Sequence, residues 1–306
     1  MKIGVACAQD QDRFLKPLLK YWAKNRKYQV KRFRQGKIAD LLDMMDWSDV
    51  TWFEWCSDVV VEISNFPRLC RNIVRLHGVE AYNKIIDNVR WERIDDLVLV
   101  APHMKRILAE RQPNVKQTKV HIIPNGIDMK RFKIPRETFN RDHITIGSLG
   151  FINHNKNQAF LFQLMKYLTD HTDKKYKLHI AGVHQSDELK DYLSHMEKAL
   201  GIDVTYWGWV KKSEEFLKGI DILVSTSMRE SFGMGIMEAM AMGVKPVVHS
   251  FVGAEGFYPD WAIFNTIDEF VALCNAPAEP QKYRDWVEKY SLKKQIEKTD
   301  ALLGVV

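Results

Sequence analysis

The chain has 306 residues, of which 46% are hydrophobic and 27% are charged. This is the composition of a globular protein long enough to bury one large core or two ordinary ones. No stretch approaches the roughly 18 apolar residues of a membrane-spanning helix, and the apolar run at the N-terminus is too short for a secretory signal. The four cysteines are far apart and form no CxxC pair, so we expect no disulfide framework, no metal site and a cytoplasmic location.

The net charge of +6 is unevenly distributed along the chain. Residues 13–37 contain ten Lys or Arg and no acid, and they also contain large apolar residues such as Phe14, Leu18 and Trp22. An amphipathic helix with a solvated basic face would explain this segment. Peripheral docking on an anionic membrane surface would explain it as well. Nucleic acid is not an expected partner, because no nucleic-acid-binding motif accompanies the basic residues.

Strand-like and helix-like patterns alternate along the first half of the chain. The expected strands are 2–7, 29–33, 50–55, 73–76 and 97–101, and the expected helices are 14–22, 38–45 and 81–88. Such alternation predicts a parallel sheet wrapped by helices, here over residues 1–125.

A second series of the same kind starts at residue 143. Its expected strands are 143–150, 176–182, 204–208, 221–225 and 244–249, and its expected helices are 158–167, 187–200, 213–218, 234–242 and 283–290. The turn-forming sequence Ile123-Pro-Asn-Gly-Ile-Asp and a polar stretch that contains proline separate the two series, so residues 126–142 are the expected hinge. Two α/β halves joined by a hinge predict a ligand site in a cleft, at the carboxyl ends of the strands.

The strand-to-helix turn at residues 221–243 has the features of an anion site. The sequence Glu230-Ser-Phe-Gly-Met-Gly opens a helix that Gly243 is expected to end. The glycines allow the backbone to approach a ligand closely, and the N–H groups and dipole of a helix start favour a diphosphate. Glu238 lies about one turn into this helix, where it can accept hydrogen bonds from ribose hydroxyls, and Glu230 can reach a second polyol.

This segment resembles the Glu-x7-Glu motif of retaining glycosyltransferases with the two-domain GT-B fold, and of family 4 in particular. Ile123-Pro-Asn-Gly-Ile-Asp resembles the inter-domain motif of that family. Ile180-Ala-Gly and Tyr206-Trp-Gly-Trp-Val resemble its strands before the nucleobase pocket. The resemblance covers residues 120–260 well and the N-terminal half loosely.

The resemblance implies an α/β GT-B fold, in which two Rossmann-like domains face each other across a cleft. Residues 1–125 would be the acceptor-side domain and 143–282 the nucleotide-sugar donor domain, and residues 283–306 would cross back to the first domain. The implied reaction is transfer of a hexosyl group from a nucleotide diphosphate sugar to an acceptor hydroxyl, with retention of anomeric configuration. The acceptor would be a sugar or a lipid-linked molecule, and the reaction would need neither a metal ion nor a cofactor.

The resemblance also assigns roles to individual residues. Glu238 would bind the ribose, Glu230 would contact the donor sugar, and Lys156 would neutralise the leaving diphosphate. His77 would contact a hydroxyl of the donor sugar, and Glu80 is an acceptor-side candidate. The remaining expected donor-binding residues are Asn157, Trp209, Val210, Ser231, Phe232, Gly233 and Met234; the backbone amides of Phe232, Gly233 and Met234 would hold the diphosphate and sugar, and Trp209 and Val210 would border the base.

The sequence departs from the family pattern in two places. Phe151 stands where the family has an Arg, five residues before Lys156, and the glycine-rich loop after the first strand is missing. Because a leaving diphosphate needs positive charge, either His154 compensates, turnover is slow, or the chain binds a nucleotide sugar without catalysis. A nucleotide-sugar epimerase of the same fold is a further alternative. Asp10-Gln-Asp12 spells the metal-binding Asp-x-Asp of another glycosyltransferase fold, but so short a pattern arises by chance.

Overall fold

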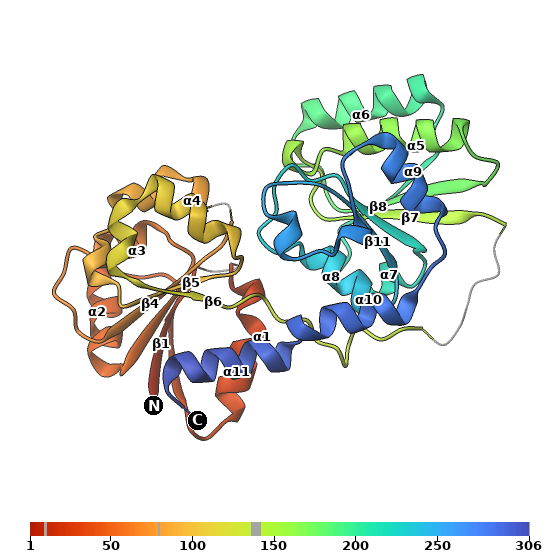
Figure 1. The fold of residues 1–306 in the computed structure, drawn as a ribbon. Coiled ribbons are helices and arrows are strands. Elements are labelled where there is room, and N and C mark those ends of the chain that lie inside the picture. Colours follow the sequence, from red (N-terminus) through yellow and green to blue (C-terminus); the bar gives the residue numbers. More distant parts are fainter. Residues whose placement is uncertain (9–10, 79, 136–141, 306) are drawn as a thin grey trace. The chain divides into compact units, whose positions relative to one another are not determined.

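The computed structural model describes residues 1–8, 11–78, 80–135 and 142–305. It divides into two compact units, Met1–Asn125 with Leu292–Val306, and Gly126–Ser291. Each unit is a parallel sheet with helices on both faces (Figure 1).

The first unit has a six-stranded sheet in the order β2-β1-β3-β4-β5-β6. Its strands are β1 (Lys2–Ala6), β2 (Gln29–Phe33), β3 (Val50–Glu54), β4 (Arg71–Leu76), β5 (Asp96–Leu99) and β6 (Lys119–Ile122). Every residue of β3 is buried, as expected for a central strand of a parallel sheet that is covered on both faces.

Helices α1 and α11 share one face of this sheet. The helices of the unit are α1 (Lys16–Lys24), α2 (Ile38–Trp47), α3 (Asp58–Ile63), α4 (His103–Arg111) and α11 (Leu292–Leu303). Leu302 and Leu303 of α11 join the core formed by β1 and α1. The hydroxyls of Tyr21 and Tyr28 donate to the Asp300 carboxylate at 2.5 and 2.7 Å. The end of the chain is therefore an integral part of the first unit.

The helix expected over residues 81–88 is replaced by two 3₁₀ turns, η2 (Glu80–Tyr82) and η3 (Lys84–Asn88). Asn83 separates them, because its side chain accepts a hydrogen bond from the Ile85 N–H at 3.1 Å and starts a new turn. Asn is a residue that caps helices more readily than it continues them. Further 3₁₀ turns are η1 (Asp12–Phe14), η4 (Trp91–Arg93) and η5 (Pro113–Gln117).

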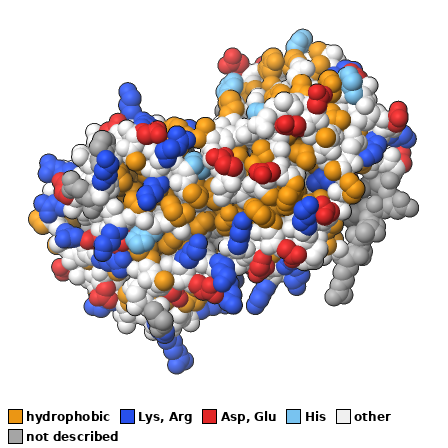
Figure 2. Space-filling model, in the orientation of Figure 1, with side chains coloured by type: hydrophobic (Ala, Val, Ile, Leu, Met, Phe, Trp, Pro, Cys, Tyr) orange, Lys and Arg blue, Asp and Glu red, His pale blue; other side chains and the backbone are white. Residues whose placement is uncertain are grey.

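The basic segment at residues 13–37 contains α1 and β2, and several of its apolar side chains belong to the core. Leu15, Leu18 and Trp22 are at most 1% exposed, whereas the ten basic side chains of the segment are all exposed. Figure 2 shows Lys and Arg side chains in number on the face of this unit that it draws. The part of the segment that faces solvent is therefore largely basic; Leu15, Leu18 and Trp22 are core residues, and Phe14 is half-buried.

The second unit has a six-stranded parallel sheet in the order β12-β11-β10-β7-β8-β9. Its strands are β7 (Ile144–Leu149), β8 (Tyr176–Ala181), β9 (Val204–Gly208), β10 (Ile222–Ser225), β11 (Lys245–His249) and β12 (Ile263–Phe264). One face is covered by α5 (Gln158–Asp170), α6 (Asp187–Leu200) and α9 (Ile267–Asn275), and the other by α7 (Ser213–Leu217), α8 (Met234–Ala241) and α10 (Pro280–Val287) (Figure 1). The remaining 3₁₀ turns are η6 (His154–Lys156), η7 (Ala254–Gly256), η8 (Asp260–Ala262) and η9 (Glu288–Tyr290).

The segment that returns to the first unit starts at Leu292, nine residues after the predicted start of the crossing segment at residue 283. Helix α10 stays in the second unit because the Arg284 guanidinium, which it carries, donates to the carbonyls of Phe132 (2.6 Å), Met129 (2.9 Å) and Ala241. The expected hinge also begins inside the second unit, where Ile127 forms a parallel bridge with Ser291. Residues 136–141 of that hinge lie outside the described residues.

In the part of the chain that the structure describes, no helix is both long enough and apolar enough to span a membrane.

Candidate functional site

The second sheet reverses its strand order next to β7. From β7 the chain moves outward through β8 to β9, and it returns to the other side of β7 with β10. In open α/β sheets, ligands bind at the carboxyl ends of the strands at such a switch point. The loops that follow β7 and β10 are therefore the expected walls of a site, and they carry Lys156 and Glu230.

Lys156 and Glu230 form an ion pair across the switch point. The 3₁₀ turn η6 presents Lys156, and the Asn153 side chain caps this turn by accepting from the Lys156 N–H at 3.0 Å. The Ser227 hydroxyl donates to the same Glu230 oxygen at 2.8 Å. The side chains of Lys156 and Glu230 are 27% and 15% exposed, so the pair is partly shielded yet accessible to a ligand.

Further hydrogen bonds join the two loops. The Thr226 hydroxyl donates to the carbonyls of Lys156 (2.9 Å) and Asn157 (3.0 Å). The Asn155 amide donates to the Arg229 carbonyl at 2.9 Å, and the Met228 N–H donates to the Asn155 carbonyl at 2.8 Å. These bonds fix the backbone on both sides of the ion pair. Nothing in the sequence singles out Thr226, Ser227 or Asn155, because small polar residues in loops carry no distinctive pattern.

Helix α8 starts at a glycine in the left-handed conformation. Gly233 has a φ of 69°, and a Cβ at this position would overlap the Tyr258 hydroxyl. Tyr258 is buried and donates to the Phe232 carbonyl at 3.2 Å. The sharp turn points the first N–H groups of α8, which have no acceptor within the helix, toward the carboxyl edge of the sheet. Residues 233 and 234 therefore form the tight helix start that the sequence predicts, and its binding of an anion stays a prediction.

The Phe232 side chain faces the interior of the second unit. It is 1% exposed and packs edge-on against the rings of Phe257 and Tyr290, at centroid distances of 5.4 and 5.5 Å. The predicted contribution of Phe232 to ligand binding is thus confined to its backbone. Ser231, which precedes it, is half-buried.

Glu238 lies one turn into α8 and is half-buried. Nearby, Arg131 makes a two-point ion pair with Glu214, at 3.0 Å from Nε and 2.5 Å from Nη2. The hydrogen bond from Arg131 to Glu214, together with the negative charges of Glu214 and Glu238, raises the pKa of Arg131. Arg131 is thus a charged neighbour of Glu238, the predicted ribose-binding residue, and nothing in the sequence singles Arg131 out.

Phe151 packs beside Trp209, the residue predicted to border the base. Their ring centroids are 5.7 Å apart, and Trp209 is 55% exposed. The loops after β7 and β8 touch closely here, because a Cβ on Gly182 would overlap the Gly150 carbonyl. Val210 follows Trp209 and is half-buried. Position 151 therefore adds an aromatic ring, and no positive charge, to this edge of the sheet.

His77 lies in the first unit, within a buried network of its own. Its Nε2 lies 2.9 Å from the Glu54 carboxylate, which also pairs with Arg75 at 3.3 Å and accepts from the Trp52 indole N–H at 2.9 Å. Although burial opposes it, the charge of Arg75 and the hydrogen bond from His77 hold the pKa of Glu54 below its ordinary value. Burial lowers the pKa of His77 despite the nearby carboxylate. A neutral His77 thus donates its Nε2–H to Glu54, and its side chain is 3% exposed.

Glu80 and Trp55 complete the surroundings of His77. The Glu80 carboxylate accepts from the backbone N–H groups of His77 (2.6 Å) and Cys56, and burial raises the pKa of Glu80 to about 8. Trp55 stacks on the His77 ring at 4.0 Å and donates its indole N–H to the Gln11 carbonyl at 2.9 Å. Its φ of 75° is rare for a residue with a side chain. Such strain is concentrated at functional sites, and Trp55 follows β3 at the switch point of the first sheet, a position for which the sequence carries no signal.

Among the described residues, no three His, Cys, Asp or Glu side chains are grouped so that they could hold a metal ion. Asp10 of the Asp-x-Asp sequence lies outside the described residues. Asp12 pairs with Arg32 at 2.8 Å and with Lys16 at 3.4 Å.

The two parallel-sheet units, each with its switch point, define the GT-B fold. The solved structure of Anabaena HepE in complex with UDP is similar to this chain over 100% of both chains, with a TM-score of 0.82 at 14% identity. The predicted fold of two Rossmann-like domains is therefore confirmed.

Sequence comparison finds similarity within the second unit. Residues 129–261 match the family model described as "Glycosyl transferases group 1". Mannosylfructose-phosphate synthase of Agrobacterium fabrum is 28% identical over 175 residues, which cover 52% of this chain and 38% of that protein. An uncharacterized glycosyltransferase of Methanocaldococcus jannaschii is 32% identical over 155 residues, or 46% and 38% of the two chains. These alignments span little more than a third of the relatives' length.

Proposed function

We propose that this protein is a glycosyltransferase that moves a hexosyl group from a nucleotide diphosphate sugar to an acceptor hydroxyl, with retention and without a metal ion. One observation carries the proposal. The Lys156–Glu230 pair and the Gly233 helix start lie on the two loops at the switch point of a unit that matches the glycosyl transferases group 1 model. The bound UDP of HepE, a protein of the same fold, supports a nucleotide donor.

The donor would bind through charge and backbone groups. Its diphosphate would lie against the first amides of α8, where the helix dipole favours an anion. Lys156 would turn from Glu230 to the diphosphate, since it is the cation already held at this point. Glu230 would then be released to accept hydrogen bonds from hydroxyls of the donor sugar, and Glu238 would accept those of the ribose.

In the transfer step, the bond between the anomeric carbon and the diphosphate oxygen breaks, and the acceptor oxygen bonds to that carbon on the same face. The acceptor proton passes to the departing diphosphate oxygen, so no enzyme nucleophile is required. Lys156 and the α8 amides stabilise the negative charge that develops on the leaving group. The acceptor is a sugar or a lipid-linked molecule.

Phe151 favours a second candidate function, a protein that binds a nucleotide sugar and does not turn it over. This residue replaces the second cation of the family pattern with a ring that packs on Trp209. A single lysine that is already paired with Glu230 provides less stabilisation for a leaving group than two cations would.

The test measures binding and turnover in the same samples. The full chain is incubated with a panel of nucleotide sugars, with and without simple sugar acceptors, and release of nucleoside diphosphate is followed together with thermal shift. Release that depends on an acceptor supports the transferase. Stabilisation by a donor without release or hydrolysis supports the binding protein, and an epimerised donor formed without an acceptor supports an epimerase.

Glu238→Ala provides the matched variant. Loss of two hydrogen bonds to a charged group costs about 3 kcal/mol, or roughly a hundredfold in donor affinity. Glu110→Ala is the control, because Glu110 is an exposed carboxylate of α4 in the first unit, paired with Arg106. If both variants bind the donor as the wild type does, the assignment of Glu238 is wrong.

We also propose that the basic side chains of residues 13–37 attract the protein to anionic membranes. Because Leu15, Leu18 and Trp22 are buried in the core, this attraction would be electrostatic and would weaken with salt. Sedimentation with anionic and with neutral vesicles tests it, and equal partitioning at low salt would contradict it.

A further inference from the structure

A pocket lies between the first turns of α5 and α6 in the second unit. Its volume is about 220 Å³, and its polar lining residues are Asn153, His154, Asn157, Gln158, Glu188 and Tyr192. His154 and Asn157 flank Lys156 in the chain, but neither Glu230 nor Glu238 lines the pocket. The pocket is therefore a neighbour of the proposed donor site that shares Asn157 with it and contains neither motif glutamate.

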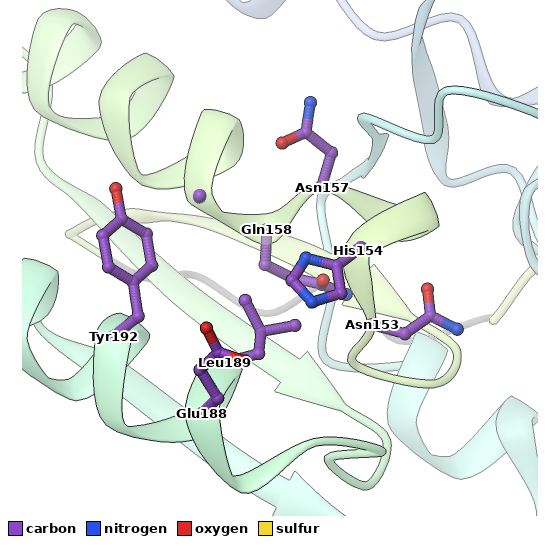
Figure 3. Close-up of a pocket in the computed structure, with 8 residues that line it drawn as sticks. Asn153, His154, Asn157, Gln158, Glu188, Leu189 and Tyr192 are labelled. Carbon is purple, nitrogen blue, oxygen red and sulfur yellow. The ribbon is translucent and has the colours of Figure 1, made fainter.

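Gln158 places an unsatisfied acceptor in this pocket. The residue is 2% exposed, and its amide N–H donates to the Phe151 carbonyl at 3.3 Å. Its Oε1 is buried and has no hydrogen-bond partner among the described residues. Figure 3 shows the Gln158 amide in the middle of the lining residues. Because a buried acceptor without a donor is costly, the position points to a ligand that donates a hydrogen bond.

The charges around the pocket favour a neutral ligand. Helices α5 and α6 both begin here, at Gln158 and Asp187, and the positive ends of two helix dipoles disfavour a cation. The Glu188 carboxylate also lines the pocket, whereas no Lys or Arg does, and this combination disfavours an anion such as phosphate. Hydroxyl groups fit both conditions, because they can donate to Gln158 and Glu188 without carrying charge.

The size of the pocket and the presence of Tyr192 further restrict the class of ligand. A volume of about 220 Å³ is below the usual range for drug-sized ligands, roughly 300–1,000 Å³, and suits a single sugar ring. Tyr192 is 48% exposed on α6, and its ring offers an apolar face for the C–H groups of a sugar. We propose that this pocket binds one neutral pyranose residue, with its hydroxyls on Gln158 and Glu188 and its apolar face on Tyr192.

His154 also lines the pocket. It is exposed, and its ring lies in front of the Gln158 amide in the view of Figure 3. Exposed side chains change rotamer rapidly, so the ring can turn aside and admit a hydroxyl. The proposal is independent of the proposed function, since it concerns binding to a pocket that neither motif glutamate lines.

The experiment titrates the full chain with glucose, galactose, mannose and N-acetylglucosamine, and follows binding by saturation-transfer NMR. At least one sugar is expected to bind saturably. Tyr192→Ala and Glu188→Gln are each expected to weaken that binding by at least about tenfold. Tyr82→Ala is the matched control, because Tyr82 is 39% exposed in the first unit, and it should leave the affinity unchanged.

Gln158→Leu separates a binding role from a structural one. The substitution removes the unsatisfied Oε1 and also the long hydrogen bond to the Phe151 carbonyl, so the thermal midpoint of the free protein should change little, whereas the stabilisation by sugar should be abolished. The proposal is overturned if none of the four sugars binds, if binding is equal in the wild type and all pocket variants, or if the diamine putrescine binds in place of the sugars.

Nucleoside diphosphate binding, measured in the same samples, reports on the proposed function separately. The pocket variants should retain it, and Glu238→Ala should lose it while keeping the sugar. Failure of one proposal is thus visible without failure of the other.

Discussion

Gly233 allows the steric argument for the start of α8 to be tested quantitatively. Its φ of 69° disfavours any residue with a side chain, which costs about 1–2 kcal/mol for alanine. A Cβ would also overlap the hydroxyl of buried Tyr258, and forcing an extra carbon into a packed site costs about 1–3 kcal/mol. Gly233→Ala is therefore expected to lower the free energy of unfolding by about 2–5 kcal/mol.

Two further variants separate the backbone cost from the overlap. Gly201 has a φ of 63° and no atom within 4 Å of its virtual Cβ, so Gly201→Ala should cost only about 1–2 kcal/mol. Tyr258→Phe removes the overlapping hydroxyl and leaves Cζ at 3.4 Å from the virtual Cβ, an ordinary contact. In a Tyr258→Phe background, the cost of Gly233→Ala should therefore fall by about 1–3 kcal/mol.

Denaturant unfolding, followed by tryptophan fluorescence with unchanged m-values, provides the free energies. Nucleoside diphosphate affinity is measured in parallel, because a shifted helix start should weaken it in Gly233→Ala and leave it intact in Gly201→Ala. The steric reasoning is refuted if Gly233→Ala costs no more than Gly201→Ala. It is also refuted if Gly233→Ala and Tyr258→Phe are additive within about 0.5 kcal/mol.

Two other predictions concern charge. Phe151→Arg should restore the cation of the family pattern and strengthen nucleoside diphosphate binding by about tenfold, the gain of one charge-assisted hydrogen bond, and this gain should shrink at high salt. Phe151→Leu is the control and should not strengthen binding. Equal affinities of the wild type and both variants would show that position 151 does not face the diphosphate. Glu80 should make the free energy of unfolding depend on pH, because burial raises its pKa from 4.5 to about 8 and so favours the protonated carboxyl in the folded state. This stabilisation by protonated Glu80 is complete below about pH 4.5 and is lost as the pH rises to about 8. Thermal midpoints of the wild type and Glu80→Gln across this range test the point, and parallel pH profiles would contradict it.

The architecture of the second unit was predictable because its periodicity is strong. The strands and helices expected between residues 143 and 249 all appear with ends shifted by at most three residues. Apolar runs such as Ile222–Ser225 and amphipathic helices such as Asp187–Leu200 determine their structure locally. Short elements without such runs were not anticipated, among them α3, β6, β12 and α9.

Some structural features of the candidate site could be predicted because only one residue type suits the position. Gly233 and Gly243 have positive φ values, which is the reason that glycine occurs at both positions, and the pairing of Lys156 with Glu230 agrees with their expected proximity to one ligand. The other features of the candidate site depend on contacts between residues far apart in the chain, which the sequence does not reveal. The buried partner of His77, Glu54, is 23 residues away in the chain, and the strain at Trp55 has no sequence signature.

The pairing of Ile127 with Ser291 has a consequence for engineering. These residues form a parallel bridge, and the Ile127 N–H donates to the Tyr290 carbonyl at 2.9 Å. The second unit, Gly126–Ser291, is thus a cassette whose entry and exit lie side by side. Domains whose two ends lie close together are well tolerated when they are inserted into another chain. Replacing this cassette by the equivalent segment of a related chain requires two joints at one place, and would exchange the second unit of the protein while retaining the first.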